Sequence, residues 1–290
     1  MRLSRRVEFH GERLEDVHPA VVIKSVNKGS PKKNTTAADR AGGYGQRITG
    51  AQYQYLESTV TFAIDVPKNL AGTRAQVFDR VRKWACGQTG RGVPDNPWLN
   101  ISFAGRQLIQ GITIPSLWST TDIPADTNGQ QRLYVDEVVF PEVGDLYDWL
   151  KEYTITFKAY TVPFWQDVSG AGGSSNVVSS GSVGLNVPGQ VKTPVNVRVQ
   201  NRSGQTIDTI TLWTDASQIK LTGLGLGGYD TLVVDHGAAN GLLSLYTSGG
   251  SVYEKYSGDN DLLINPGDQK LYFSANRAVY VYAEAYGRYL

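Results

Sequence analysis

An alternating segment that runs directly into glycine and serine most limits how this chain can fold. Over Tyr153–Thr161 the apolar residues fall at every second position, with threonine, lysine and tyrosine between them. This period of two predicts a half-buried β-strand. Val162 precedes Pro163, which favours extended backbone and should end the strand. Residues 169–182 are then rich in glycine and serine, so a folded part of the chain is predicted to close here.

Domain organisation follows from that glycine- and serine-rich segment, because it holds no long apolar run. We predict a first domain over residues 1–166, a flexible linker over residues 167–190 and a second domain over residues 191–290. A length of 290 residues with 40% hydrophobic residues is sufficient for two cores. Cys86 is the only cysteine, so no disulfide can form within the chain and packing or assembly must stabilise it.

The first domain is predicted to be α+β. Apolar residues over 72–85 recur at helical spacing and predict an amphipathic helix with Trp84 on its apolar side. Residues 52–66 predict a strand with apolar groups on both faces. Further strands are predicted at residues 98–103, 106–114 and 132–140, with a helical turn at 145–151.

The segment Lys24–Arg47 differs in composition from its surroundings. It is rich in lysine, glycine, asparagine and threonine, and Asp39 is its only acidic residue. We interpret it as a long exposed loop. Two readings stay open: a solvated surface loop, or an arm that becomes ordered against a neighbouring subunit.

The second domain is predicted to be entirely β. Its alternating segments and turn residues recur at the short spacing that is typical of a β-sandwich. The predicted strands are residues 195–200, 207–213, 218–221, 231–235, 241–246, 252–256, 261–264, 269–275 and 278–286. We therefore expect a mainly β chain.

No combination of residues indicates catalysis, a cofactor or a metal. The histidines His10, His18 and His236 are scattered, and one cysteine cannot complete a familiar zinc site. The sequence lacks a phosphate-binding loop and a nucleophile elbow. A net charge of +1 does not indicate a nucleic-acid partner. We predict no catalytic, cofactor-binding or metal-binding residues.

Three weaker patterns have simpler explanations. Gly223–Gly228 matches a dinucleotide-binding pattern, but a predicted strand follows it where a helix is required, so we interpret it as a connector. Asp235–His236 suggests half of a catalytic triad without an activated nucleophile. Asp259–Asp261 lacks the later glycine and glutamate of a calcium-binding loop.

Aromatic side chains of the second domain support a different hypothesis. A β-sandwich can bind a sugar by stacking it on an exposed ring beside polar groups. The candidates are Trp213, Tyr229, Tyr246, Tyr253 and Tyr256. A carbohydrate-binding module for host cell-surface recognition is therefore an alternative function.

The order of these features resembles the distal tail proteins of siphoviruses, the bacteriophages with long, non-contractile tails. The helix Thr73–Ala85 has a tryptophan near its end, and the closing strand ends in an aromatic pair after proline over Val162–Trp165. A flexible linker and a sandwich follow, and Asn265–Gln269 forms the last turn before the C-terminal strand. The family often has aspartate where Val162 stands, and usually Gly-x-Asn where this chain has Gly267–Gln269.

The resemblance implies a structural virion protein at the distal tail tip, without enzymatic activity. Six subunits form a ring that stacks on the tail tube protein and leaves a channel through which DNA passes. The N-terminal α+β belt domain, a β-sandwich with one helix, makes the ring. The C-terminal galectin-like β-sandwich points outwards and carries receptor-binding proteins, and a tail-associated hub protein lies below. Without a secretory signal or an apolar window of about 18 residues, we expect synthesis in the bacterial cytoplasm and no membrane insertion.

Overall fold

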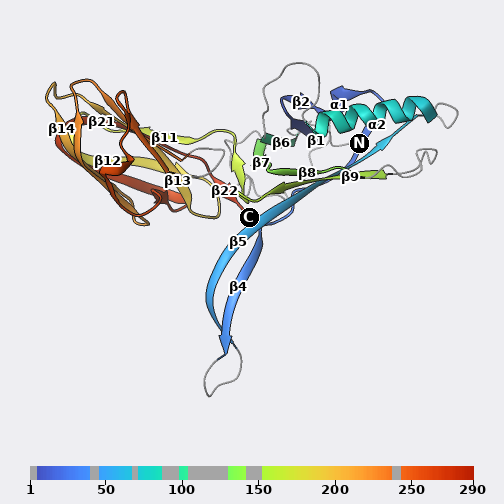
Figure 1. Ribbon diagram of the computed structural model, residues 1–290, viewed down its shortest axis with the longest axis horizontal. Coiled ribbons are helices and arrows are strands. Elements are labelled where there is room, and N and C mark those ends of the chain that lie inside the picture. Colours follow the sequence, from blue (N-terminus) through green and yellow to red (C-terminus); the bar gives the residue numbers. More distant parts are fainter. Residues whose placement is uncertain are drawn as a thin grey trace, which may run out of the picture. The chain divides into compact units, whose positions relative to one another are not determined.

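The structure, a computed structural model, forms two compact units, Met1–Trp165 and Gln166–Leu290. Both are built mainly from antiparallel strands, which confirms the predicted mainly β fold (Figure 1). The structure describes residues 5–39, 46–66, 71–86, 98–103, 130–141, 152–236 and 243–290.

One sheet of the first unit is organised around a single long strand, β5 (Gln46–Ile64). Its second half lies between β3 and β9, and β8 pairs with the far side of β9. Its first half pairs with β4. The bounds of these neighbours are β3 (Val21–Asn27), β4 (Lys32–Asp39), β8 (Glu137–Val139) and β9 (Glu152–Ala159).

A second sheet of this unit contains strands in the order β2-β1-β6-β7. The strands are β1 (Arg5–Phe9), β2 (Glu12–Arg13), β6 (Trp98–Phe103) and β7 (Gln130–Tyr134). Two helices, α1 (Leu14–Val17) and α2 (Ala71–Ala85), complete the described part of the unit.

Helix α2 forms where the apolar spacing predicts it. Its apolar stripe is buried: Val77, Phe78, Val81, Trp84 and Ala85. The Trp84 ring meets Phe9 and Phe157 edge-on, and its indole Nε1 donates a hydrogen bond to the Glu12 carbonyl oxygen at 2.8 Å. Trp84 is thus an anchor of the core, as its place on the apolar stripe predicts.

Alternation along β5 and β9 separates a buried face from an open one. On β9 the side chains of Tyr153, Ile155, Phe157 and Ala159 are buried, whereas those of the intervening residues are partly or fully exposed. The buried face of β5 carries Val60, Phe62 and other residues of the same parity. The open face is therefore polar and accessible.

Two expectations for the first unit were wrong. The predicted loop Lys24–Arg47 is largely strand, because it pairs with β5 as the end of β3 and as β4. The predicted strand 132–140 breaks at Val135–Asp136 into β7 and β8, which lie in different sheets. The predicted strand at 106–114 and helical turn at 145–151 lie outside the described residues.

The second unit is one curled sheet with the order β18-β17-β16-β13-β21-β14-β15-β19, and β11, β12 and β20 pair at its sides. A 19-residue strand, β21 (Gly267–Ala285), runs through it and packs Leu271, Phe273, Val279 and Val281 into the core. The two strands that we predicted for 269–275 and 278–286 are thus continuous. The short helix η2 (Tyr253–Lys255) replaces most of the strand predicted at 252–256.

The other strands of this unit are short. They are β11 (Ala171–Ser174), β12 (Val178–Val187), β13 (Thr193–Asn201), β14 (Ile207–Trp213), β15 (Gln218–Leu226), β16 (Thr231–His236), β17 (Leu243–Thr247), β18 (Gly250–Ser251), β19 (Tyr256–Gly258) and β20 (Leu263–Ile264). At the boundary with the first unit, β10 (Trp165–Asp167) neighbours β22 (Arg288–Tyr289).

The expected flexible linker at 167–190 is wrong, because most of it is strand. Both β11 and β12 pair with β21, and Val183, Leu185 and Val187 of β12 are buried in the core. The glycines have a packing reason, since a Cβ on Gly173 would collide with the carbonyl oxygen of Gly184. Glycine here allows two strands to lie close together, and the alternation of the last three apolar residues was the signal we missed.

Candidate functional site: a projecting hairpin and its aromatic root

A two-stranded hairpin extends from the first unit's sheet (Figure 1). Its register runs from the pair Lys32 and Tyr55 to the pair Asp39 and Gln46. The strand β9, which covers the opposite edge of β5, begins its pairing only at Leu56. Beyond Tyr55 the hairpin therefore has two strands and no third among the described residues. We call residues 32–39 and 46–55 the arm.

Both outer edges of the arm carry unpaired backbone groups in the described part of the chain. Strand edges of this kind are templates for pairing with another chain. An isolated two-stranded hairpin is also only marginally stable in water. The arm is thus a segment whose stability would increase with a partner.

Aromatic rings surround the place where the arm leaves the sheet. Tyr53 meets Phe164 edge-on at a centroid distance of 5.1 Å, and Tyr55 lies 5.8 Å from Tyr160. The buried Trp165 donates a hydrogen bond from Nε1 to the Lys28 carbonyl oxygen at 3.0 Å. We call these five rings the aromatic root. They fix the base of the arm to the end of the segment that follows β9.

Lysines on the arm and just before it add cation–π contacts to the aromatic root. The Nζ atoms of Lys28, Lys32 and Lys33 lie 5.1, 4.6 and 5.8 Å from the ring centroids of Trp165, Tyr55 and Tyr53, respectively. Contacts of this geometry are attractive even at exposed sites. Lysine, which we interpreted as a sign of a solvated loop, here helps to hold the arm.

Gly29 lies in the connection from β3 to β4 and permits a close crossing, in which this connection passes against the backbone of β5 at Glu57. Its φ is +67°, its N–H donates to Asn27 Oδ1 at 3.0 Å, and a Cβ would collide with the Glu57 carbonyl oxygen. Only glycine meets both the backbone and the space requirement. The direction of the arm therefore depends on this residue.

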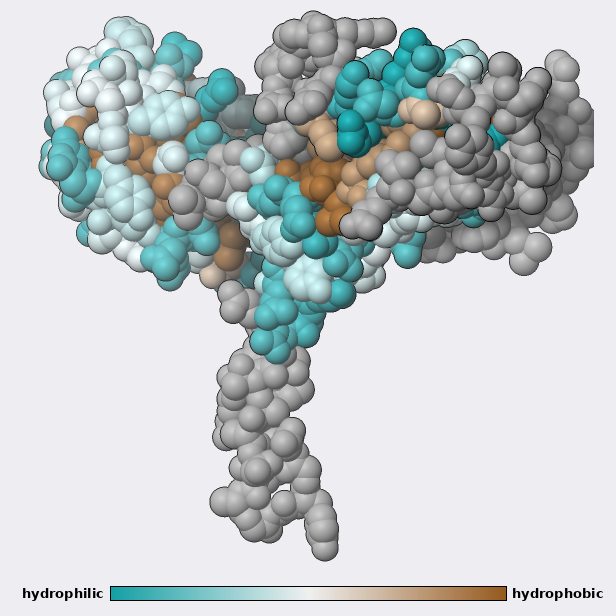
Figure 2. Space-filling model, turned by 45° about the vertical axis from the view of Figure 1, so that its right-hand side comes forward, coloured by the Kyte–Doolittle hydropathy of each residue, from teal (hydrophilic) through white to brown (hydrophobic). Residues whose placement is uncertain are grey.

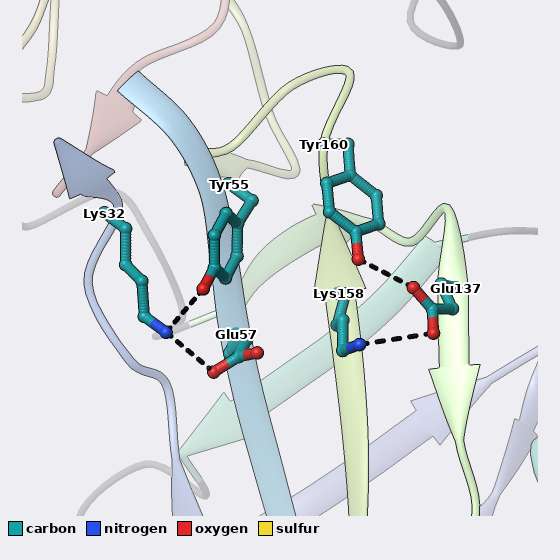
Figure 3. Close-up of polar contacts among 6 residues, drawn as sticks. All are labelled: Lys32, Tyr55, Glu57, Glu137, Lys158 and Tyr160. Atoms are coloured by element: carbon teal, nitrogen blue, oxygen red, sulfur yellow. Dashed lines mark hydrogen bonds and ion pairs between the residues drawn. The ribbon is translucent and has the colours of Figure 1, made fainter. Parts of the chain in front are cut away.

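Charged side chains of alternating sign cross the open face of the sheet beside the root (Figure 3). Lys32 pairs with Glu57 at 3.3 Å and Lys158 pairs with Glu137 at 3.2 Å. Glu57 and Lys158 are register partners on β5 and β9, which completes a row of four charges. We call this row the charge ladder.

Hydroxyl groups of two tyrosines hold the ends of the charge ladder. The Tyr160 hydroxyl donates to Glu137 at 2.7 Å, and this bond, followed by that from Lys158, lowers the pKa of the Glu137 carboxyl. The Tyr55 hydroxyl accepts from Lys32 Nζ at 2.6 Å, and this bond, followed by that to Glu57, raises the pKa of Lys32. The pKa shifts of Glu137 and Lys32 both favour the charged form, so the charge ladder is suited to ion pairing and not to proton transfer.

The structure does not bring the predicted chemical candidates together. His18 Nδ1 accepts a hydrogen bond from the Ala20 N–H, and His236 Nε2 accepts one from the Leu262 N–H. Asp235 and His236 alternate along β16, so they face opposite sides. Burial, followed by the Arg288 charge, lowers the pKa of His236 to about 4. His236 is a neutral structural acceptor.

The remaining patterns have structural roles as well. Asp259 Oδ2 accepts from the Gln218 N–H at 2.7 Å, which holds a turn against β15. Gly223–Leu226 belongs to β15, with no helix after it. The described residues contain no group of three or more potential metal ligands. None of the helices in the described ranges is long and apolar enough to cross a membrane.

The aromatic candidates of the second unit lie at separate places. Tyr229 is 69% exposed in a turn, and Tyr246 is 42% exposed on β17. Tyr253 and Tyr256 form a pair at 5.5 Å, but Tyr256 packs against the core. Trp213 is half-buried on β14 and stacks on Tyr272, a residue that our sequence reasoning did not single out.

No family model and no curated protein matches the sequence. Among solved structures, the crystal structure of the SPP1 Dit protein, described as a paradigm of the hub adsorption apparatus in phages infecting Gram-positive bacteria, matches 98% of this chain and 99% of its own. The sequence identity is 11% and the TM-score is 0.59. Chains of the phage P2 baseplate in its activated conformation, with Ca or with Sr, match at 7% and 6% identity, with a TM-score of 0.45 and 98% coverage of both chains. The resemblance to distal tail proteins that the sequence predicts is therefore confirmed for the fold, which is similar to that of SPP1 Dit.

Proposed function

We propose that this protein is a structural component of a phage tail tip, where copies of the chain assemble into a ring between the tail tube and the baseplate. The observation that carries the proposal is the arm, a rooted hairpin whose two outer edges lack partners in the described chain. The similarity of the fold to SPP1 Dit supports the tail location.

The arm binds the neighbouring copy in this proposal. When a second chain adds a strand, the backbone groups at a strand edge form hydrogen bonds with it. These hydrogen bonds come from the main chain and not from the side chains. The surface where the arm leaves the unit is hydrophilic (Figure 2), so the contact at the arm's base is polar. The root fixes the direction of the arm, which reduces the entropy lost on assembly.

The same contact repeated around a rotation axis closes a ring, because a head-to-tail interface can close on itself. We propose six copies, as the resemblance to distal tail proteins implies.

DNA passes through the central channel without recognition of its base sequence, since a net charge of +1 provides no general attraction to phosphate. The first unit makes the belt, which contacts the tail tube protein and the tail-associated hub protein. The second unit is the galectin-like domain that carries receptor-binding proteins.

A shortened arm tests this proposal directly. Asn34 and Gln52 are register partners, so residues 35–51 can be replaced by Asn-Gly, which favours a tight hairpin turn. Mass photometry at micromolar and nanomolar concentration, followed by negative-stain imaging, measures assembly. We expect six-fold rings with an open centre for the wild type and monomers of unchanged thermal stability for the shortened chain.

Tyr246→Ala is the matched control, because it removes an exposed side chain of the second unit. Its rings should equal those of the wild type. Rings of normal size from the shortened chain would refute the role of the arm. A wild-type chain that stays monomeric at both concentrations would refute assembly by this chain alone.

A further inference from the structure

Trp213 and Tyr272 form a stacked aromatic pair on the outer face of the second unit's sheet. They are register partners on β14 and β21, their ring centroids are 5.7 Å apart and their planes differ by 16°. Both side chains are half-buried. We call this pair the aromatic platform. A tryptophan that keeps part of its ring in water on an outer sheet face is unusual, because tryptophan is highly buried on average.

The platform lies in one row of the sheet with polar or small neighbours on both sides. Gln218 of β15 is the partner of Trp213, and Ser182 of β12 is the partner of Tyr272. Both are exposed. Beside them on β12, nothing lies within 4 Å of the place where Gly184 would carry a side chain. The rings are therefore bordered by hydrogen-bonding groups and by open space.

The rest of this face is polar. Along β14, β15, the first half of β21 and β12 beyond its exposed first residue, Val178, the other outward positions carry hydroxyl, amide, carboxylate or ammonium groups or no side chain. Thr211 of β14, Lys220 of β15 and Lys270 of β21 lie at outward positions next to the platform. Within the described residues, their side chains form no hydrogen bond or ion pair.

We propose that the aromatic platform binds a pyranose ring of a saccharide. A pyranose has a face of C–H groups that packs on the negative face of an aromatic ring, while its hydroxyls point sideways to polar partners. Gln218, Ser182 and Lys270 are placed to meet those hydroxyls. A protein partner fits this face less well, since interface hot spots are surrounded by further well-packed contacts that exclude water.

Tyr246, which is 42% exposed elsewhere on this sheet, provides a contrast. Tyr246 of β17 is the register partner of Val233, and no second ring lies against it among the described residues. A sugar on Tyr246 would have one ring and an aliphatic neighbour, where the platform offers two nearly parallel rings. Tyr246→Ala is therefore the matched control for loss of an exposed aromatic.

Fluorine NMR of the full chain labelled with 5-fluorotryptophan can detect the site. The sequence has six tryptophans, and Trp213 is the only one in Gln166–Leu290. Trp213→Phe assigns its resonance. The probes are maltohexaose, cellohexaose and chitotetraose. We expect one of them to shift the Trp213 resonance alone and in a saturable way, with a Kd of about 1 mM, which is typical of a small exposed site.

Two variants test which rings bind. Tyr272→Ala should weaken the saccharide-dependent shift at least tenfold, and Trp213→Ala should weaken binding similarly in calorimetry, whereas Tyr246→Ala should bind as the wild type does. Circular dichroism confirms folding of each variant.

A Trp213 resonance that no probe shifts overturns the proposal, as does binding that survives Trp213→Ala. A resonance that saccharides leave unchanged but purified phage tails broaden would identify a protein contact instead. Ring assembly does not enter any of these measurements.

Discussion

The two longest strands of the molecule, β5 and β21, each span 19 residues but are used differently. The strand β21 has a neighbour along most of its length and two neighbours over residues 272–274, at residue 279 and over residues 282–285. The strand β5 has two neighbours over residues 59–63 and only β4 over most of its first half. One long strand is enclosed by its own unit, while the other extends beyond it.

The difference separates stability that the chain supplies itself from stability that a partner can add. Over the first part of β21, Leu271 and Phe273 at alternate positions are buried in the core and Ala275 packs against it, so pairing and burial reinforce each other. The arm has pairing without a third strand. We therefore expect changes near β21 to act on folding, and changes at the arm to act mainly on assembly.

Phe273→Ala should have the largest effect on folding. Phe273 is 1% exposed within the core of the second unit, and truncation of a buried phenylalanine costs about 4 kcal/mol of unfolding free energy. Urea unfolding measures the loss. If β21 is enclosed by its own unit, the loss should be the same at nanomolar and micromolar protein. A loss that disappears on assembly would show that a neighbouring copy also stabilises β21.

Gly29→Ala should cost about 3 kcal/mol, because it combines a positive φ with a collision at Glu57. Gly204→Ala is the control, since Gly204 has a φ of +68° but nothing within 4 Å of an added Cβ. Thermal unfolding should show a smaller decrease for the control, which carries the backbone strain alone. Equal decreases for the two variants would mean that the close crossing at the base of the arm is unimportant.

Acid should destabilise the second unit through His236. Its pKa is about 4 in the folded chain, chiefly through burial and then through Arg288, against 6.5 as the ordinary value. The unfolded chain therefore gains a proton first, and the contribution of neutral His236 is complete above pH 6.5 and lost as the pH falls towards 4. The difference corresponds to about 3 kcal/mol at most.

His236→Gln isolates this contribution, because the amide oxygen can accept from the Leu262 N–H but does not titrate. Urea unfolding between pH 7 and pH 4 should show a shallower decline for the variant. Asp261 Oδ1 lies 4.0 Å from His236 Nε2 and Arg288 also faces the site, so both charges stay in place in the comparison. Parallel pH profiles for the two chains would contradict the assignment.

Sequence reasoning succeeded where side-chain periodicity and core burial agree. The stripe of α2 and the alternation Tyr153–Ala159 of β9 lie where the sequence predicts them. Sequence reasoning failed where the residue composition is typical of a loop although the segment pairs as a strand. Serine and glycine in β12 cover the outer face of a strand whose buried side holds Val183 and Leu185, and the lysines of the arm contact rings that are distant in sequence.

The parts of the candidate site are long-range, which explains why the sequence did not reveal them. The aromatic root joins Tyr53 and Tyr55 to Tyr160 and Phe164 across about a hundred residues of sequence. Tyr272 was overlooked because its ring partner, Trp213, comes from another strand. The periodicity of apolar residues and the residues typical of turns identify helices and strands. The contacts between those strands depend on the register in which they pair, which the sequence pattern does not give.

Lys158→Gln should have the smallest effect on folding among these substitutions. Lys158 and Glu137 are partly exposed, and water screens such pairs. Thermal unfolding of the monomer should change little, and the small difference at low salt should vanish at high salt.

Reversal of the charge by Lys158→Glu places three carboxylates in one row with Glu57 and Glu137. If the charge ladder faces a neighbouring copy, that variant should raise the concentration needed for rings while the monomer unfolds nearly as before. Equal losses of folding and assembly would show that the ladder serves only its own unit, and the arm alone would then distinguish β5 from β21.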